Sequence, residues 1–481
     1  MTNFKKTDGI FRNTNFLLLL IVLFGLSLRL IFFSGMGISD SLAYSKAAND
    51  LNLGKGIDPN STLTLSTRLG LVYATAFSYS IFGINEFSAV LFPLLASIAG
   101  IILIFYFGKL LFNEKIGLLA AFLLSFFPLE VVYSTQLLSD LPSAFFMSLG
   151  VYVFLYAELK KGLKYGLSYL LSGILIGIGY MIRESALLIA LFFAAYMLYK
   201  RRIKKWYFLV PLGVILVFAL ESLIFFSLTN DALFRFHASQ KYLRESVISH
   251  NYFGRLDFPT GLFHYPWLFL TNSLLAFFYM PVFIAALCLF FNRRKESALL
   301  LLWFIPLLVY LSFGSSSLAD YLPFKASDRY TEIFTMPAIL LLAFFLTEKN
   351  MPIKRVITPL AIIILLSSSI AIVYVREDRS LLSGLKELHP FVKSLKKPVY
   401  IDDRSLKALG YISEYSLDKD LREYPNDLGN IKDSYVIINK EMIENLKVAD
   451  KKRQFPKEIE NPPANWQVIK ERDNIKVYYL P

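Results

Sequence analysis

The stretch AVLFPLLASIAGIILIFYFGKLL, residues Ala89–Leu111, decides the fold class. Its only charged residue is Lys109, close to its end. An α-helix rises 1.5 Å per residue, so this stretch as a helix would be about 35 Å long. That length crosses a bilayer core of about 30 Å, and the stretch therefore predicts a transmembrane helix.

Similar apolar runs recur along the chain. Of its 481 residues, 55% are hydrophobic and 18% are charged, whereas a soluble protein has about 25% charged residues. The sequence therefore predicts a mainly α-helical, polytopic transmembrane bundle. The other apolar runs are Phe16–Ser34, Leu69–Phe82, Ile116–Tyr133, Leu141–Ala157, Tyr165–Ile182, Ser185–Tyr199, Trp206–Leu228, Trp267–Phe291, Ser297–Phe313, Ile333–Leu346 and Val356–Val375.

The net charge of +13 does not indicate a nucleic-acid partner, because the basic residues form short clusters between apolar runs. Such clusters mark the cytoplasmic loops of membrane proteins. Arg29 lies inside the first run, near enough to its outer end for the side chain to reach the interface. The single cysteine, Cys288, allows no disulfide within the chain.

The positions of the clusters predict the topology. If Leu69–Phe82 does not span the membrane, every cluster lies on the same side as the amino terminus. A helix of that length rises only about 21 Å, which favours an interfacial or re-entrant helix. We therefore expect about eleven spans in a cell membrane, a cytoplasmic amino terminus, and an extracytoplasmic loop 35–88 with juxtamembrane helices.

Residues 376–481 form a polar tail that is expected to fold outside the membrane as a small α/β domain, after a transmembrane catalytic domain over 1–375. The segment SLLSGLKELHPFVKSL (380–395) has helical spacing, and PVYID (398–402) and SYVIIN (434–439) are typical of buried strands. The segment NWQVIKERDNIKVYYLP (465–481) predicts a hairpin that turns at Asp473-Asn474. This tail has no glycine-rich phosphate loop, and a structural role is expected for it.

Two acidic residues, Asp40 and Asp140, stand at the outer ends of spans, each just before a predicted helix. Each could serve only as a helix cap, because a carboxylate can accept hydrogen bonds from the first backbone N–H groups of a helix. Ionisable groups at the membrane edge more often mark a functional site, and two of them together favour an active site.

The outer segments also carry four cations, Arg68, Arg183, Lys325 and Arg329. Each could instead bind lipid headgroups. Together with two acids they suit a reaction in which a base activates an acceptor and cations stabilise a departing phosphate. Three histidines in the long outer loop, at 237, 250 and 264, match no compact metal-ligand spacing, so no metal site is predicted.

These features, in this order, resemble the C-type (GT-C) membrane glycosyltransferases of the dolichyl-phosphate-mannose protein mannosyltransferase and aminoarabinose transferase group. SDSLAYSKAANDL (39–51) resembles their first-loop Asp-x-x-x-Tyr-x-x-Ala motif. The segments that begin at Arg68 and Lys115 resemble the re-entrant helix and the region of the second acid. GILIGIGYMIRESALLIAL (173–191) and SDRYTEIFTMPAILLLA (327–343) resemble later landmarks of the family.

The resemblance implies a polyprenyl-phosphate sugar donor in the membrane and transfer to a hydroxyl of a protein or glycolipid on the outer face. It implies that Asp40 is the catalytic base and Asp140 a supporting acid, with inversion at the anomeric carbon. Arg68, Arg183, Lys325 and Arg329 would bind the donor phosphate, and Tyr44, Glu184 and Tyr330 would contact substrate. Because Ser41 follows Asp40 where the family often has glutamate, a metal-assisted reaction is disfavoured and no cofactor is expected.

Two other functions compete with this interpretation. A ligase or polymerase of lipid-linked polysaccharides would also use outer-loop cations. A transporter would show related halves and broken helices near the membrane midplane. The chain has no internal repeat, and its two acids lie at span ends, which favours the glycosyltransferase.

Overall fold

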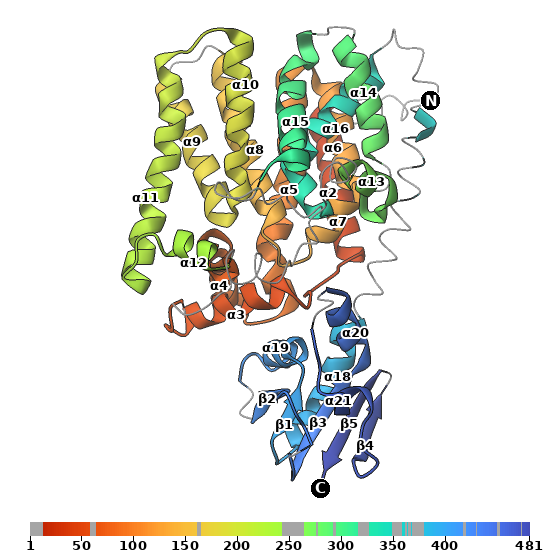
Figure 1. Cartoon of the computed structure of the whole chain (residues 1–481). Helices are drawn as coiled ribbons and strands as arrows, with labels where there is room; N and C mark the ends of the chain where they lie inside the picture. Colours follow the sequence, from red (N-terminus) through yellow and green to blue (C-terminus); the bar gives the residue numbers. More distant parts are fainter. Residues whose placement is uncertain are drawn as a thin grey trace, which may run out of the picture.

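The computed structural model shows a helical bundle followed by a smaller α/β unit. The bundle is in the upper part of Figure 1 and the α/β unit is in the lower part. The residues that the structure describes are 13–57, 64–160, 165–242, 264–275, 278–291, 295–315, 327–348, 358–360, 363, 367, 380–416, 420–429, 431–449, 453–472 and 474–481.

The bundle is built from helices that mostly follow the apolar runs of the sequence. Short 3-10 turns occur between some of them, and the turns at 64–67, 184–189 and 328–331 adjoin or contain site residues. The elements are α2 (Thr14–Ile31), α3 (Asp40–Asn52), η1 (Thr64–Thr67), α4 (Leu69–Phe82), α5 (Glu86–Leu111), α6 (Glu114–Phe126), α7 (Pro128–Tyr133), α8 (Asp140–Leu159), α9 (Tyr165–Ile182), η2 (Glu184–Ile189), α10 (Ala190–Lys200), η3 (Lys205–Phe208), α11 (Leu209–Thr229), α12 (Phe234–Tyr242), α13 (His264–Thr271), η6 (Ser273–Leu275), α14 (Tyr279–Phe291), α15 (Lys295–Phe313), η7 (Asp328–Thr331) and α16 (Glu332–Thr347).

The chain is a membrane protein. In the described part of it, five helical stretches are long and apolar enough to cross a bilayer: Thr14–Ile31, Glu86–Leu111, Asp140–Leu159, Lys205–Thr229 and Asp328–Thr347. Other apolar helices, α4 among them, are shorter. Helix α4 has the bounds expected for the short run, whereas the total of eleven spans stays a prediction. The run Val356–Val375 lies largely outside the described residues.

Two of the expected spans are interrupted. The run Ile116–Tyr133 divides into α6 and α7 at Phe127, whose backbone is extended. Pro128 is the reason, because a proline disfavours helical geometry in the residue before it and donates no backbone hydrogen bond. The run Trp267–Phe291 likewise divides into α13, η6 and α14.

The expectation for Arg29 is wrong, because its side chain does not reach the membrane surface. Arg29 is fully buried, and its Nε donates to the hydroxyl of Ser97 at 2.9 Å. Its Nη1 donates to the backbone carbonyl of Ser125 at 3.2 Å, and Nη2 lies 3.7 Å from the carboxylate of Glu130. Arg29 therefore fastens α2 to α5, α6 and α7.

The described part of the carboxyl-terminal unit has the elements expected from its sequence, three more helices and one more strand, β2. The helix α18, the strand β3 and the hairpin β4–β5 are confirmed, and Arg472 pairs with Ile475 next to the turn. The sheet has the order β2-β1-β3-β5-β4, with β1 parallel to β2 and β3 and the other pairs antiparallel. Its elements are α18 (Ser380–Ser394), β1 (Val399–Ile401), α19 (Asp403–Ile412), β2 (Leu421–Glu423), β3 (Ser434–Asn439), α20 (Lys440–Ala449), α21 (Lys457–Glu460), β4 (Gln467–Arg472) and β5 (Ile475–Leu480).

This unit docks against helix α3 and the amino terminus of α5. The hydroxyl of Tyr415 donates to that of Ser45 at 2.9 Å, and Lys386 pairs with Glu86 at 2.8 Å. In Figure 1, α3 lies across the end of the bundle nearest the sheet, whereas the α10–α11 connection lies at the opposite end. The basic cluster Arg201–Lys205 and the residue Asp40 are therefore at opposite ends of the bundle.

Candidate active site

Five corners of the fold meet near the amino terminus of α3, and each contributes site residues predicted from the sequence. Asp40 is the first residue of α3, Arg68 directly precedes α4, and Asp140 is the first residue of α8. Arg183 precedes η2, and Arg329 lies in η7. Helix amino termini carry partial positive charge, so the corners and their arginines together form an electropositive region.

The Asp40 carboxylate is held by Arg329. Its Oδ2 accepts from Nη1 of Arg329 at 2.7 Å, and its Oδ1 accepts from the hydroxyl of Ser39 at 3.4 Å. Ser39, the residue at the cap position, makes no side-chain cap hydrogen bond. About a fifth of the Asp40 side chain stays exposed, so a substrate can reach it. The ion pair, rather than capping, is the contact that the structure gives to this acid.

Asp140 forms the second acid–arginine pair, with Arg183. This pair is buried, and the Arg183 guanidinium also lies 4.8 Å from the centre of the Tyr330 ring. Arg329 lies 5.7 Å from the same ring on its own turn. Tyr330 therefore stands between the two arginines and links the pairs through cation–π contacts.

Arg68 joins the site from the α4 corner. Its Nη1 donates to the hydroxyls of Tyr44 and Ser139, the latter at 3.1 Å, and its Nη2 donates to Glu184 at 3.2 Å. The hydroxyls of Tyr44 and Ser139 are 3.2 Å apart and both side chains are fully buried. Tyr44 lies one helical turn after Asp40, which places α3 firmly against this cluster.

The charges in the cluster keep the carboxylates ionised. Desolvation by the surrounding protein opposes the charge on Asp40, but Arg329, with Arg68 and Arg183, outweighs it and holds the pKa of Asp40 below its ordinary value. Desolvation is likewise outweighed at Glu184, where Arg235 and Arg68 hold the pKa of that carboxyl well below its usual range. Both acids are therefore anions at neutral pH.

The structure thus brings together eight of the nine site residues predicted from the sequence. The eight are Asp40, Tyr44, Arg68, Asp140, Arg183, Glu184, Arg329 and Tyr330. The ninth, Lys325, lies outside the described residues.

Sequence reasoning missed two charged residues in contact with this cluster, Arg235 and Glu221. Arg235 lies on α12 and Glu221 within α11, and their side chains are joined at 2.6 Å. The signal for Glu221 was present, because it is the only charged residue in a 21-residue apolar helix. A lone ionisable residue in such a helix usually faces a partner inside the protein.

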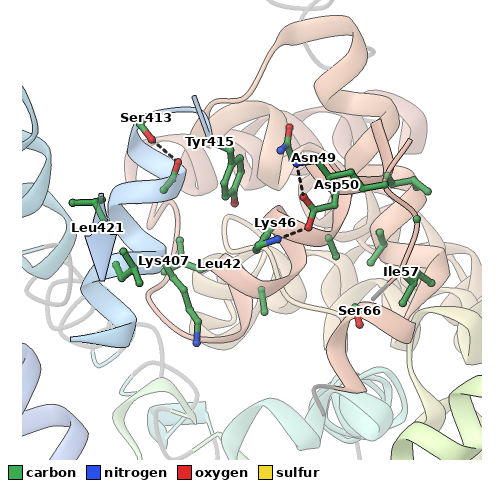
Figure 2. Close-up of a pocket in the computed structure, with 18 of the residues that line it drawn as sticks. Leu42, Lys46, Asn49, Asp50, Ile57, Ser66, Lys407, Ser413, Tyr415 and Leu421 are labelled. Carbon is green, nitrogen blue, oxygen red and sulfur yellow. Dashed lines mark hydrogen bonds and ion pairs between the residues drawn. The ribbon is translucent and has the colours of Figure 1, made fainter. Parts of the chain in front are cut away.

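A separate cavity of about 640 Å³ lies between α3 and the carboxyl-terminal unit (Figure 2). Apolar side chains such as Leu42 and Ile57 line it together with Lys46, Lys407 and Asp50. Its lining, as far as the chain is described, contains neither Asp40 nor Asp140. Helix α3 therefore presents the acid–arginine cluster on one face and this cavity on another.

The arrangement can support displacement of a phosphate by a hydroxyl. Asp40 is an ionised and partly exposed carboxylate that can accept a proton, and the arginines that depress its pKa weaken it as a base while they stay bound to it. Arg329 and Arg68 are donors of the geometry that binds phosphate oxygens. A phosphate at these arginines would have a base beside it in a partly desolvated site.

Comparison with known structures defines the class. The structure is similar to that of ArnT from Cupriavidus metallidurans bound to undecaprenyl phosphate, with a TM-score of 0.64 and 12% identity over 96% of this chain and 97% of that chain. It is also similar to the Archaeoglobus fulgidus oligosaccharyltransferase tethered with an acceptor peptide, with a TM-score of 0.55 and 14% identity over 91% of this chain and 71% of that chain. The fold is that of the GT-C membrane glycosyltransferases, which confirms the resemblance predicted from the sequence.

The sequence itself supports the same class. Residues 69–225, about a third of the chain, match the dolichyl-phosphate-mannose-protein mannosyltransferase family. This matched segment includes Asp140, Arg183 and Glu184 but begins after Asp40 and Arg68. An uncharacterized protein of Aquifex aeolicus is 24% identical over 313 residues, which span 64% of this chain and 66% of that protein.

Proposed function

We propose that this chain transfers a sugar from a polyprenyl-phosphate carrier to a hydroxyl acceptor at the outer surface of the membrane. The observation that carries the proposal is the partly exposed Asp40–Arg329 pair at the meeting point of the helix amino termini, within a GT-C fold. The undecaprenyl phosphate of the ArnT structure supports a carrier of this chemical class.

In the proposed reaction, the donor phosphate binds the arginines and Asp40 takes the proton of the acceptor hydroxyl. The acceptor oxygen then forms a bond to the anomeric carbon of the sugar. The bond from that carbon to the phosphate oxygen breaks, and its electron pair leaves with the phosphate. One displacement inverts the anomeric centre, and the cations stabilise the charge that grows on the leaving group.

Arg329 links the two halves of this reaction. In the structure it is bonded to Asp40, so a donor phosphate that binds Arg329 has to compete with the carboxylate. Exchange of partners would leave Asp40 free to accept a proton only after the donor is bound. The resting pair would therefore keep the base occupied until there is a sugar to transfer.

The buried Asp140–Arg183 pair has a supporting role in this proposal. It fixes the start of α8 to the η2 corner and, through Tyr330, faces the turn that carries Arg329. Tyr44 and Glu184 hold Arg68 in place. We propose proteins or glycolipids as acceptors, and the acceptor peptide tethered in the Archaeoglobus fulgidus structure supports the first of these.

The proposed orientation places the site outside the cell. The catalytic membrane domain would comprise residues 1–375 with a cytoplasmic amino terminus, and an extracytoplasmic domain would comprise 376–481. With Cys288 replaced by serine, single cysteines at the exposed positions Lys55 and Glu471 should be labelled in intact cells, and a cysteine at Arg201 only after permeabilisation. The opposite labelling pattern would reverse the orientation.

Transfer itself is tested with purified protein in lipid nanodiscs. Polyprenyl-phosphate-linked hexoses and pentoses are supplied with a membrane extract as the acceptor source, and release of free polyprenyl phosphate is followed by mass spectrometry. The proposal expects release that requires both acceptor and Asp40. Release that is equal for wild type and Asp40→Asn, or no release from any polyprenyl-phosphate donor, would contradict it.

A further inference from the structure

Arg235 lies near the site and makes several hydrogen bonds and a cation–π contact, but the proposed reaction gives it no role. It lies on α12, in the loop after α11, and only 5% of its side chain is exposed. Its Nε and Nη2 both donate to one oxygen of Glu184, at 3.1 and 2.7 Å. Its Nη1 donates to Glu221 at 2.6 Å, and its guanidinium lies 4.4 Å from the centre of the Tyr180 ring.

These contacts fix Arg235 from three sides. Glu221 comes from the interior of α11, Tyr180 from α9, and Glu184 from η2. A planar guanidinium that is stacked on a ring and bonded to two carboxylates has one orientation available. The position of Glu184 is therefore set by a group that is itself immobile.

Glu184 passes this constraint on to Arg68. Its two oxygens are divided between the arginines, because Oε1 accepts from Arg235 and Oε2 accepts from Arg68. Arg68 in turn donates to Tyr44, one turn after Asp40 on α3, and to Ser139, which directly precedes Asp140. An unbroken series of contacts thus runs from Glu221 in the bundle, through Arg235 and Glu184, to Arg68 at the site.

We propose that Arg235 is a positioning residue, which holds Glu184 so that Arg68 is oriented to bind the phosphate of a polyprenyl-phosphate donor; this inference rests on the proposed function. Arg235 does not touch the donor. Its effect on the donor passes through Arg68, because Glu184 is bonded to both arginines.

This arrangement would strengthen donor binding because it orders Arg68 in advance. A long arginine side chain loses rotational freedom when it binds a ligand, and the loss weakens binding unless the side chain is already ordered. Glu184 orders Arg68 before the donor arrives. Without Arg235, the half-exposed Glu184 would lose its stronger contact, and the orientation of Arg68 would no longer be fixed.

A purely structural role makes a different prediction. If Arg235 only fastened α12 to the bundle, its removal would change donor affinity whether or not Arg68 is present. If it acts through Arg68, the two removals are coupled and their effects on affinity do not add. A double-mutant cycle therefore separates a positioning residue from a structural one.

The experiment measures equilibrium binding of undecaprenyl phosphate and, in parallel, dolichyl phosphate to purified full-length protein in nanodiscs. Arg235→Gln is made together with Glu221→Gln, so that no buried carboxylate is left unpaired and the protein can fold. Lys386→Gln, which removes an exposed ion pair at the same end of the molecule, is the matched control. Retention time on size exclusion and thermal stability are compared for every variant.

We expect Arg68→Gln and the Glu221→Gln/Arg235→Gln protein each to weaken binding by about tenfold, and Lys386→Gln to leave it unchanged. In the Arg68→Gln background, adding Glu221→Gln/Arg235→Gln should weaken binding by less than about twofold. Equal weakening in both backgrounds, or none in either, would overturn the positioning role while the proposed function stands. Absence of binding by the wild type to both lipids would overturn the proposed function and this inference with it.

Discussion

Two acid–arginine pairs stand at the same end of the bundle and differ in exposure. Asp40 and Arg329 keep 22% and 26% of their side chains exposed, whereas Asp140 and Arg183 keep 4% and 9%. A partly exposed pair can exchange a partner for a substrate at small cost, because water and the ligand replace what is lost. A buried pair cannot, because losing one partner leaves an uncompensated charge. The difference favours chemistry at the first pair and rigidity at the second.

Removing the basicity of Asp40 should give the largest effect on turnover. Asp40→Asn keeps the shape of the side chain but cannot accept the acceptor's proton, and general-base catalysis contributes about a hundredfold or more. Transfer by the purified variant should therefore fall at least about a hundredfold, while expression and thermal stability stay close to wild type. Near-normal transfer would show that Asp40 is not the catalytic base.

Removing the charge of Arg329 should give the next largest effect, on donor use. Arg329→Gln loses one charge-assisted contact to phosphate, worth about 1.5–3 kcal/mol, so the KM for the donor should rise about tenfold to a hundredfold. Steady-state kinetics with increasing donor concentration measures this. An unchanged KM would place the phosphate elsewhere.

Arg329→Gln should also change the pH dependence of kcat/KM. In the wild type the arginines outweigh desolvation and hold the pKa of Asp40 below its ordinary value, so the carboxylate keeps its charge to a lower pH than a free aspartate would. The contribution of this charge to folding stability is present above the pKa of Asp40 in the unfolded chain, and it is lost as the pH falls through the lower pKa of the folded state. In Arg329→Gln desolvation is less opposed, the pKa of Asp40 in the free enzyme rises, and the acid limb of kcat/KM should move to higher pH. An acid limb that does not move would contradict the coupling of Asp40 to Arg329.

The buried pair should respond mainly in stability. Asp140→Asn leaves Arg183 charged and buried without its carboxylate, a change that costs about 3–5 kcal/mol in other proteins. The thermal midpoint in nanodiscs should fall clearly, and turnover of the protein that remains folded should fall less than for Asp40→Asn. A loss of turnover as large as that of Asp40→Asn, without a loss of stability, would give Asp140 a chemical role.

The smallest effect is expected at the exposed pair on the same helix. Lys46 and Asp50 form an i,i+4 ion pair on the face of α3 that borders the cavity in Figure 2. Exposed pairs of this kind contribute about 0.3–0.5 kcal/mol. Asp50→Asn should therefore leave stability and sugar transfer nearly unchanged, and it is the matched control for Asp40→Asn. A large loss of transfer would extend the active site to the cavity side of α3.

The sequence was informative where a residue contrasts with its local surroundings. Asp40 and Asp140 are acids at the ends of apolar runs, and the clustered lysines and arginines separated the loops, so the candidate residues that the structure gathers into one cluster could be predicted. The strands of the carboxyl-terminal unit were found through their apolar runs, although β2, with only three residues, was too short to detect.

Partners that are distant in the sequence could not be found in this way. Arg29 was expected at the membrane surface, but Ser97 and Glu130 bind it inside the bundle, and no local pattern marks that contact. Arg235 was missed for the same reason, because its contacts depend on how α12 folds back on α11. Glu221 could have been found as the lone charged residue of an apolar helix. The break at Pro128 could not be predicted from the proline alone, because Pro93, Pro306 and Pro337 lie inside unbroken helices.

The most direct test of the central claim is a structure of the protein in nanodiscs with undecaprenyl phosphate or dolichyl phosphate bound. The account predicts that the phosphate contacts the Arg329 guanidinium in place of Asp40, that the Asp40 carboxylate is turned toward the position of the sugar, and that the Asp140–Arg183 pair is unchanged. A bound phosphate remote from Arg329, with the Asp40–Arg329 pair intact, would contradict it.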